Sequence, residues 1–300
     1  MAENMALLSR RLLIAAASVA LAAGACSSED QGGSVERAPD GPAAATPFPA
    51  APSPTARAPL RYVSLGDSYS AGGGLAGGTE PCGRAPSAYP TLVAQRAALD
   101  ASFHACNGAT TDHVLDRGQH SGQGRQIDGI SADSDVVTLS IGGNDIGFGP
   151  VIRECVLGEQ SCVRFDGRVT AALAALGRRL TGVYSEVRKR APAADILVLG
   201  YPRLVADPEQ TGLSMCAGLT AEEASWVRQK GDELDRVVRT AADAAGVRFV
   251  DAASAFAGHE ACTAEPWMEG ISLATAVSSF HPNAAGHDQL ARLVVRALGR

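Results

Sequence analysis

The chain has 300 residues, 46% of them hydrophobic, and a formal net charge of −6 at pH 7. This length and composition suffice for a sizeable apolar core, in one large domain or two small ones. The acidic balance and the lack of a basic cluster argue against nucleic acid as a partner.

The first segment of the chain has the pattern of a secretory signal. Arg10 and Arg11 precede an apolar stretch over residues 12–25, which is short for a membrane span. We therefore interpret residues 1–25 as a signal peptide and expect an exported, extracellular protein.

The end of this signal is typical of a bacterial lipoprotein, in which the cysteine at the cleavage site is lipidated. Small residues precede Cys26, and Ser27 and Ser28 follow it. Seven cysteines also leave one unpaired in an oxidising compartment, and lipidation of Cys26 would account for it. We expect an anchor on the outer face of the cell membrane. Because Ala23 stands where a larger aliphatic residue is commoner, an ordinary signal peptide is the alternative.

Residues 26–59 have the composition of a linker. They are rich in Ala, Gly, Ser and Thr and include seven prolines. Such a segment buries too little apolar surface to offset its chain entropy. We expect a disordered tether between the anchor and a domain over residues 60–300.

From residue 60 onward, short apolar runs alternate with amphipathic stretches. Nearly continuous apolar runs are typical of parallel strands that are buried on both faces. The predicted strands are Tyr62–Leu65, Ser102–Ala105, Val136–Ile141, Ile196–Leu199 and Val247–Val250. The predicted helices are Ser87–Leu99, Val169–Arg190, Ala221–Ala245 and a last one capped by Asn283 and ending near Leu298. This alternation predicts an α/β fold, a three-layer α/β/α sandwich with a five-stranded parallel sheet wound as in flavodoxin.

Four short motifs stand at strand ends or helix starts. They are Gly66-Asp67-Ser68-Tyr69-Ser70, Asn107-Gly108-Ala109, Gly142-Gly143-Asn144-Asp145 and Phe280-His281-Pro282-Asn283. Ligand sites of open parallel sheets lie at the carboxyl ends of the strands. We therefore expect Ser68, Gly108 and Asn144 to meet at that edge, joined by His281 from the loop before the final helix.

Together these motifs resemble those of the SGNH branch of the GDSL esterase and lipase family. The chain looks similar to the secreted actinobacterial lipases of the Streptomyces type over nearly all of residues 60–300. The resemblance implies the SGNH hydrolase fold and a serine hydrolase that cleaves carboxylic esters with no cofactor and no metal.

Ester hydrolysis by a serine needs a nucleophile, a base and donors for the oxyanion. Ser68 is the candidate nucleophile and would form an acyl-enzyme, although by itself it is equally suited to be a helix N-cap. Of the six histidines, only His281 has the Pro-Asn flank of the family's last block, so it is the candidate general base. The backbone amides of Ser68 and Gly108 and the side-chain amide of Asn144 are the candidate oxyanion hole.

The aspartates beside these residues, Asp67 and Asp145, are interpreted as structural hydrogen-bond acceptors with no chemical role.

One position departs from the family pattern. The family commonly has an aspartate three residues before the histidine, and here that residue is Ser278. A serine has no negative charge with which to orient the imidazole, so we expect the main-chain carbonyl of Ser278 to do so. A carboxylate brought in by folding is the alternative, with Glu265, Glu269 and Asp288 nearest in sequence.

Six cysteines lie in the predicted domain, and sequence alone cannot choose among their 15 pairings. The resemblance implies the disulfides Cys82–Cys106, Cys155–Cys162 and Cys216–Cys262. A metal site is disfavoured because none of these cysteines forms a CxxC pair.

The substrate within this class stays open. We expect an esterase or lipase that acts as a monomer on small-molecule or lipid esters, with its choice set by loops over residues 71–86 and 147–164. The alternatives are a phospholipase or a carbohydrate O-deacetylase of the same fold, or a non-catalytic surface lipoprotein that binds glycans or lipids. An intact nucleophile, base and donor set argues against the last.

Overall fold

The computed structural model describes residues 58–211, 215–216, 218–270 and 279–300. The predicted signal peptide, Cys26 and nearly all of the predicted tether lie outside the described residues.

A five-stranded, fully parallel sheet forms the centre of the domain. Its strands are β1 (Arg61–Gly66), β2 (Asp100–Phe103), β3 (Val136–Ser140), β4 (Asp195–Leu199) and β7 (Arg248–Val250), in the order β2-β1-β3-β4-β7. Numbered within the sheet this order is 2-1-3-4-5, the flavodoxin-like winding. The five predicted strands and the predicted fold class are confirmed. A separate antiparallel pair joins β5 (Met215–Cys216) and β6 (Leu219–Thr220).

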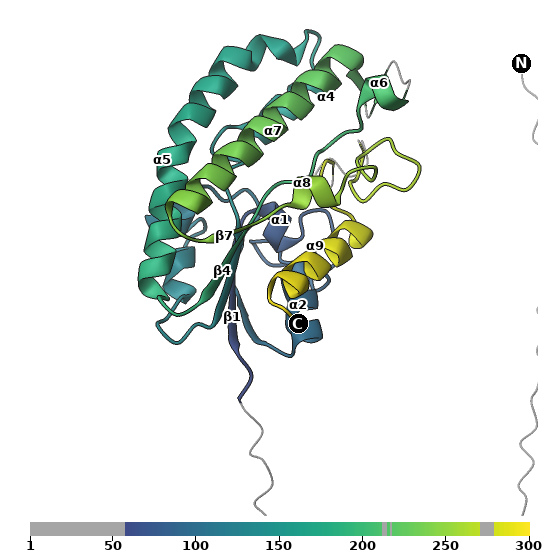
Figure 1. The fold of residues 1–300 in the computed structure, drawn as a ribbon. Helices are drawn as coiled ribbons and strands as arrows, with labels where there is room; N and C mark the ends of the chain where they lie inside the picture. The colour runs from purple at the N-terminus through teal and green to yellow at the C-terminus, as the bar shows by residue number, and fades with distance from the viewer. Residues whose placement is uncertain (1–57, 212–214, 217, 271–278) are drawn as a thin grey trace, which may run out of the picture. The chain divides into compact units, whose positions relative to one another are not determined.

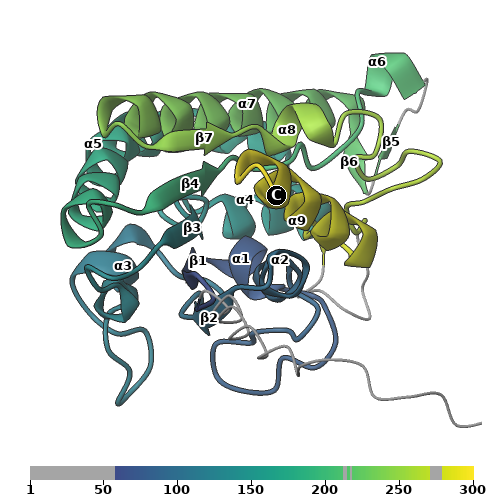
Figure 2. The same ribbon diagram turned by 60° about the horizontal axis from the view of Figure 1, so that its bottom comes forward.

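Helices cover both faces of this sheet (Figure 1). On one face the two long helices α5 (Asp166–Arg190) and α7 (Ala221–Ala244) pack on each other. On the other, α2 (Tyr89–Ala97) packs on α9 (Ala284–Ala297), as Figure 2 shows from the end of the molecule. The four predicted helices are confirmed within three residues at each end, and Asn283 caps α9 by accepting from the amide of Gly286. None of the helices that the structure describes is both long and apolar enough to cross a bilayer.

The segment over residues 147–164, expected as a loop, is mostly helical, so that prediction is wrong. Helix α4 (Phe148–Leu157) buries Phe148, Val151, Ile152 and Cys155. The helix was missed because Gly147, Gly149 and Pro150, which disfavour helix, lie at its start. Gly147 nevertheless precedes the helix, as a left-handed N-cap, and Pro150 lies in the first turn, where proline is tolerated.

The remaining short helices connect strands to these layers. They are α1 (Ser68–Ala71), α3 (Thr111–Leu115), η1 (Gln126–Gly129), η2 (Cys162–Phe165), α6 (Pro208–Thr211) and α8 (Ala252–Ala255). Of these, α1 matters most for the site, because it begins directly after β1.

Candidate active site

A glycine turn brings Ser68 to the end of β1. Gly66 has φ of +128°, and a Cβ there would lie 2.4 Å from the carbonyl oxygen of Ser140 on the adjacent β3. No other residue fits so close to a neighbouring strand in this conformation. The chain turns at once into α1, of which Ser68 is the first residue and Asp67 the N-cap, accepting from the amide of Tyr69. Ser68 is therefore inside the helix and not its cap.

His281 reaches Ser68 from the other end of the chain. Its Nε2 lies 2.7 Å from the Oγ of Ser68, and its Nδ1 lies 3.0 Å from the carbonyl oxygen of Ser279. A carbonyl only accepts hydrogen bonds, so Nδ1 carries a proton in this contact and the neutral ring presents the lone pair of Nε2 to the serine hydroxyl. This is the arrangement that a general base needs.

A main-chain carbonyl lies against Nδ1 of His281, while the prediction made for Ser278 stays open. Ser278 lies outside the described residues, and the carbonyl described against Nδ1 belongs to Ser279, one residue nearer to the histidine. Phe280 has φ of +58°, and this left-handed residue turns the chain between Ser279 and His281 so that the carbonyl faces back onto the ring.

Backbone pairing with residues 266–269 fixes the histidine loop. Glu269 donates its amide to the carbonyl of His281 and accepts from the amide of Phe280. Asn283 likewise donates to the carbonyls of Trp267 and Pro266. The alternative orienting residue Asp288 instead forms ion pairs with Arg96 and Arg292, on the outer surface of α9.

Gly108 and Asn144 end two neighbouring segments at the same edge. Gly108 has φ of +76°, and neither its backbone amide nor that of Ser68 donates a hydrogen bond to another described residue. One hydrogen of the Asn144 side-chain amide is donated to the carbonyl of Ala109 at 2.9 Å, which leaves the other available. All three donors line the cavity in front of Ser68.

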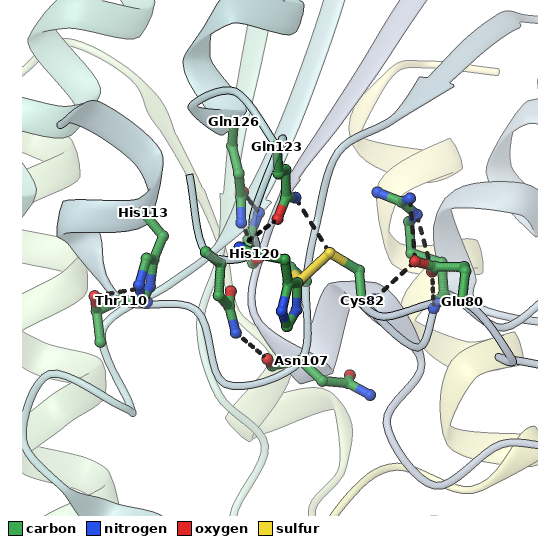
Figure 3. The surroundings of a disulfide bond; sticks show 12 residues. Glu80, Cys82, Asn107, Thr110, His113, His120, Gln123 and Gln126 are labelled. Atoms are coloured by element: carbon green, nitrogen blue, oxygen red, sulfur yellow. Dashed lines mark hydrogen bonds and ion pairs between the residues drawn. A yellow bond between two sulfur atoms is a disulfide. The ribbon is translucent and has the colours of Figure 1, made fainter. Parts of the chain in front are cut away.

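The Gly108 loop is fixed by a disulfide and several hydrogen bonds. Cys106 is bonded to Cys82, whose carbonyl accepts from the amide of Asn107. Figure 3 shows Gln123 donating to the sulfur of Cys82, and a further amide side chain, that of Gln119, donates to the carbonyl of Asn107 at 2.6 Å. Both the amide and the carbonyl of Asn107, the residue before Gly108, are thereby hydrogen-bonded.

The two aspartates that were expected to be structural, Asp67 and Asp145, accept hydrogen bonds from neighbouring protein groups. Burial raises the pKa of Asp67 to about 7, against the opposing effect of hydrogen bonds from the hydroxyl of Tyr201 and the amide of Tyr69. Burial also raises the pKa of Asp145, which accepts from the amide and hydroxyl of Thr111. These contacts suit the structural role expected of both residues, and Asp67 also lies on the wall of the cavity in front of Ser68.

A cavity of about 840 Å³ opens in front of the serine. Ser68, His281, Gly108 and Asn144 lie on its wall. Its other lining is largely apolar: Phe148, Ile152, Val156 and Leu157 of α4, Phe165 of η2, Leu204, and Leu234 of α7. The helix that the sequence did not predict therefore forms much of the substrate cavity.

The structure contains two of the disulfides that the family resemblance implies, Cys82–Cys106 and Cys155–Cys162, and Cys262 is also disulfide-bonded. The side chain of Cys216, its expected partner, lies outside what the structure describes. Within the described part of the chain, the one grouping of metal-ligand side chains joins His120 to Cys82 and Cys106. Both sulfurs are in the disulfide, so they offer no thiolate to a metal.

The sequence analysis missed three residues that surround Ser68 and His281, the candidate catalytic dyad. Tyr69 and Tyr201 line the cavity, and Gly73 lies so close that a Cβ on it would be 2.8 Å from Ser68 and 3.0 Å from His281. Tyr201 follows β4 as Ser68 follows β1, so its place at the carboxyl edge of the sheet was the available signal.

Comparison with known proteins agrees with this geometry. The pattern of the GDSL-like Lipase/Acylhydrolase family matches residues 64–289. The chain is 36% identical over 234 residues to Lipase 1 of Streptomyces coelicolor, an alignment that covers 75% of this chain and 81% of that protein.

Two solved structures are also similar. Phospholipase A1 of Streptomyces albidoflavus matches with a TM-score of 0.69 and 36% identity, covering 81% of this chain and 100% of that one. The extracellular lipase of Streptomyces rimosus matches with a TM-score of 0.70 and 32% identity, covering 79% and 99%.

Proposed function

The chain belongs to the GDSL-like lipase/acylhydrolase family and is a carboxylic ester hydrolase, and we propose that it cleaves its esters through an acyl-enzyme on Ser68 with His281 as general base. The observation that supports this mechanism most directly is the 2.7 Å contact between Oγ of Ser68 and Nε2 of His281.

In the first step Oγ of Ser68 attacks the ester carbonyl carbon while Nε2 of His281 takes the hydroxyl proton. The carbonyl of Ser279, 3.0 Å from Nδ1, holds the ring in the required tautomer and stabilises the imidazolium that forms. The imidazolium then gives its proton to the leaving alcohol. Water, deprotonated by the same nitrogen, attacks the acyl-enzyme; the bond from Oγ to the acyl carbon then breaks, the acid leaves, and the imidazolium returns the proton to Oγ of Ser68.

The amides of Ser68 and Gly108 and the second Asn144 hydrogen would stabilise the tetrahedral oxyanion. The disulfide-linked loop and the Asn144–Ala109 hydrogen bond hold two of these donors before substrate arrives. Such preorganised donors are worth about 3 kcal/mol each in the transition state.

The cavity favours a long acyl group over acetyl. Its volume of about 840 Å³ is larger than an acetyl group fills, and its wall along α4 offers apolar surface that an acetyl group would leave uncovered. Buried apolar contacts stabilise a bound chain by about 0.8 kcal/mol per methylene, so longer acyl groups bind more tightly until the cavity is filled.

A profile of kcat/KM on p-nitrophenyl esters from acetyl to palmitoyl tests this proposal. We expect a maximum at medium or long chains and complete loss in Ser68→Ala. A maximum at acetyl would favour a deacetylase, and the absence of turnover by a folded sample would favour a binding protein.

Phospholipid esters are the second candidate substrate. They are favoured by the similarity to a phospholipase A1 at 36% identity, together with the acyl-sized cavity. Release of fatty acid from phosphatidylcholine vesicles, compared with release from triacylglycerol emulsions, distinguishes a phospholipase from a lipase.

Export is proposed from residues 1–25, and the similarity to an extracellular lipase supports it. Lipidation of Cys26, with residues 27–59 as a tether, is proposed from the sequence alone. Mass spectrometry of the N-terminal peptide from detergent-extracted and medium fractions distinguishes a diacylglyceryl cysteine from simple cleavage.

A further inference from the structure

Tyr201 connects the nucleophile turn to the oxyanion loop. Its hydroxyl donates to Oδ2 of Asp67 at 2.5 Å and accepts from the amide of Gly143 at 3.0 Å. Asp67 directly precedes Ser68, and Gly143 directly precedes Asn144. One buried phenol oxygen therefore bridges the residues next to the proposed nucleophile and the proposed oxyanion donor.

This bridge adds to the other hydrogen bonds of the loop, in which the carbonyl of Gly143 accepts from the amide of Phe148 and the side chain of Asn144 donates to the carbonyl of Ala109. Gly142 and Gly143 have no side chains, and Gly142 has φ of +123°. A glycine pair has wide conformational freedom, and the peptide between Gly142 and Gly143, whose N–H is donated to Tyr201, is stabilised in one orientation by this partner from outside the loop. Tyr201 is 7% exposed, and its own amide donates to Oδ1 of Asp235 at 3.2 Å, so it is fixed at both ends.

Tyr69 connects the nucleophile helix to the histidine loop. It is the residue after Ser68, and its hydroxyl donates to the carbonyl of Phe280 at 2.6 Å. Phe280 is in the left-handed region at φ of +58°, which a non-glycine residue keeps only when its surroundings hold it there. The residue that follows is His281, whose ring centroid lies 5.3 Å from that of Tyr69.

The two tyrosines also contact each other. Their rings pack edge to face with centroids 5.0 Å apart, and both line the cavity. The hydroxyls of this packed pair thus connect three segments from distant parts of the sequence: the Ser68 turn, the Gly143–Asn144 loop and the Phe280–His281 loop.

We propose that Tyr69 and Tyr201 are positioning residues of the hydrolase: Tyr201 sets the Asn144 donor, and Tyr69 sets the His281 base, relative to Ser68. This inference rests on the proposed function. Neither hydroxyl acts on the substrate, because both are occupied by protein partners; each acts through the residue that it holds.

The test uses three tyrosine-to-phenylalanine variants of the full chain. Tyr201→Phe and Tyr69→Phe remove the two hydroxyls and leave the rings in place. Tyr184→Phe is the matched control, because its hydroxyl is buried without a hydrogen-bond partner in the described structure and lies on α5, outside the cavity lining. All are compared at the best chain length of the wild-type protein, with thermal denaturation to verify folding.

We expect kcat to fall about tenfold to a hundredfold in Tyr201→Phe and in Tyr69→Phe, with KM nearly unchanged, because small misplacements of catalytic groups cost that much. Tyr184→Phe keeps wild-type turnover. A structural role alone would lower thermal stability and leave kcat of the folded enzyme intact.

Double variants show through which residue each tyrosine acts. In an Asn144→Ala background, Tyr201→Phe should cost little more, because the donor that it positions is already gone; in a His281→Ala background the same holds for Tyr69→Phe. Fully additive losses, or wild-type kcat in the single variants, would overturn the proposal.

The wild-type protein separates this inference from the proposed function. If a fluorophosphonate does not label Ser68 of the wild type, the proposed function fails. If it labels Ser68 and the tyrosine variants turn over at the wild-type rate, only the positioning role fails.

Discussion

A single methyl group added at Gly73 should disable the dyad. A Cβ there would lie 2.8 Å from Cβ of Ser68, 3.0 Å from Cδ2 of His281 and 3.2 Å from its Nε2. Ordinary carbon contacts are about 3.5–4.0 Å, so one partner must move by roughly 0.7 Å. The backbone of Gly73 is outside the positive-φ region, so alanine adds steric pressure and no backbone strain.

This displacement falls on the contact between the proposed nucleophile and the proposed base. Moving either side chain by that amount stretches the 2.7 Å contact between Ser68 and His281 past about 3.2 Å, beyond a good hydrogen bond. We expect Gly73→Ala to lower kcat about a hundredfold, and to destabilise the fold by about 1–3 kcal/mol through overpacking.

Turnover of a p-nitrophenyl ester and urea denaturation measure the two effects separately. Gly167→Ala is the matched control: Gly167 lies on α5 outside the cavity lining, and a Cβ on it would meet nothing within 4 Å. We expect the control to keep wild-type turnover. Wild-type kcat in Gly73→Ala would refute the close dyad geometry on which this reasoning depends.

Three further changes test the electrostatics and the cavity. Burial lowers the pKa of His287 to about 3, so the free energy of unfolding should fall by up to about 1.4 kcal/mol per pH unit below about pH 6.5. Urea denaturation should show a smaller pH dependence in His287→Asn. The Oδ1 of this asparagine can still accept from the amide of Tyr89, as Nδ1 of His287 does. The raised pKa of Asp67 acts in the opposite sense, because the stability that the neutral carboxyl contributes in acid is lost as the pH rises through about 7. The free energy of unfolding of Asp67→Asn should therefore rise by about 4 kcal/mol relative to that of the wild type between pH 4 and 7. A difference between the two proteins that does not change with pH would be contrary evidence. Val156→Trp fills part of the α4 wall, so the chain-length profile should shift to shorter esters while acetyl turnover is kept; an unshifted profile would place the acyl chain elsewhere.

The sequence places two of the candidate site residues at the sheet edge for one physical reason. Ser68 and Asn144 follow buried strands, and parallel strands bring their carboxyl ends to one edge of the sheet, so strand identification alone was enough to place them. His281 was identified by its flanking proline and asparagine, and Asn283 indeed begins the next helix.

The features that sequence reasoning missed depend on contacts between distant segments. Helix α4 begins among glycine and proline residues, so its periodicity is visible only once its buried face has a partner. Tyr201 is held at the site by a hydrogen bond to Asp67, 134 positions away in the sequence. The carbonyl of Ser279 reaches His281 because of a left-handed Phe280, a conformation that no propensity predicts for phenylalanine.

The central claim is that Ser68 is the nucleophile activated by His281. Incubation with a fluorophosphonate, digestion and peptide mass spectrometry test it most directly. The account predicts rapid, stoichiometric labelling of Ser68, abolished in Ser68→Ala and strongly slowed in His281→Ala. A label on another serine, or equally fast labelling without the histidine, would contradict it.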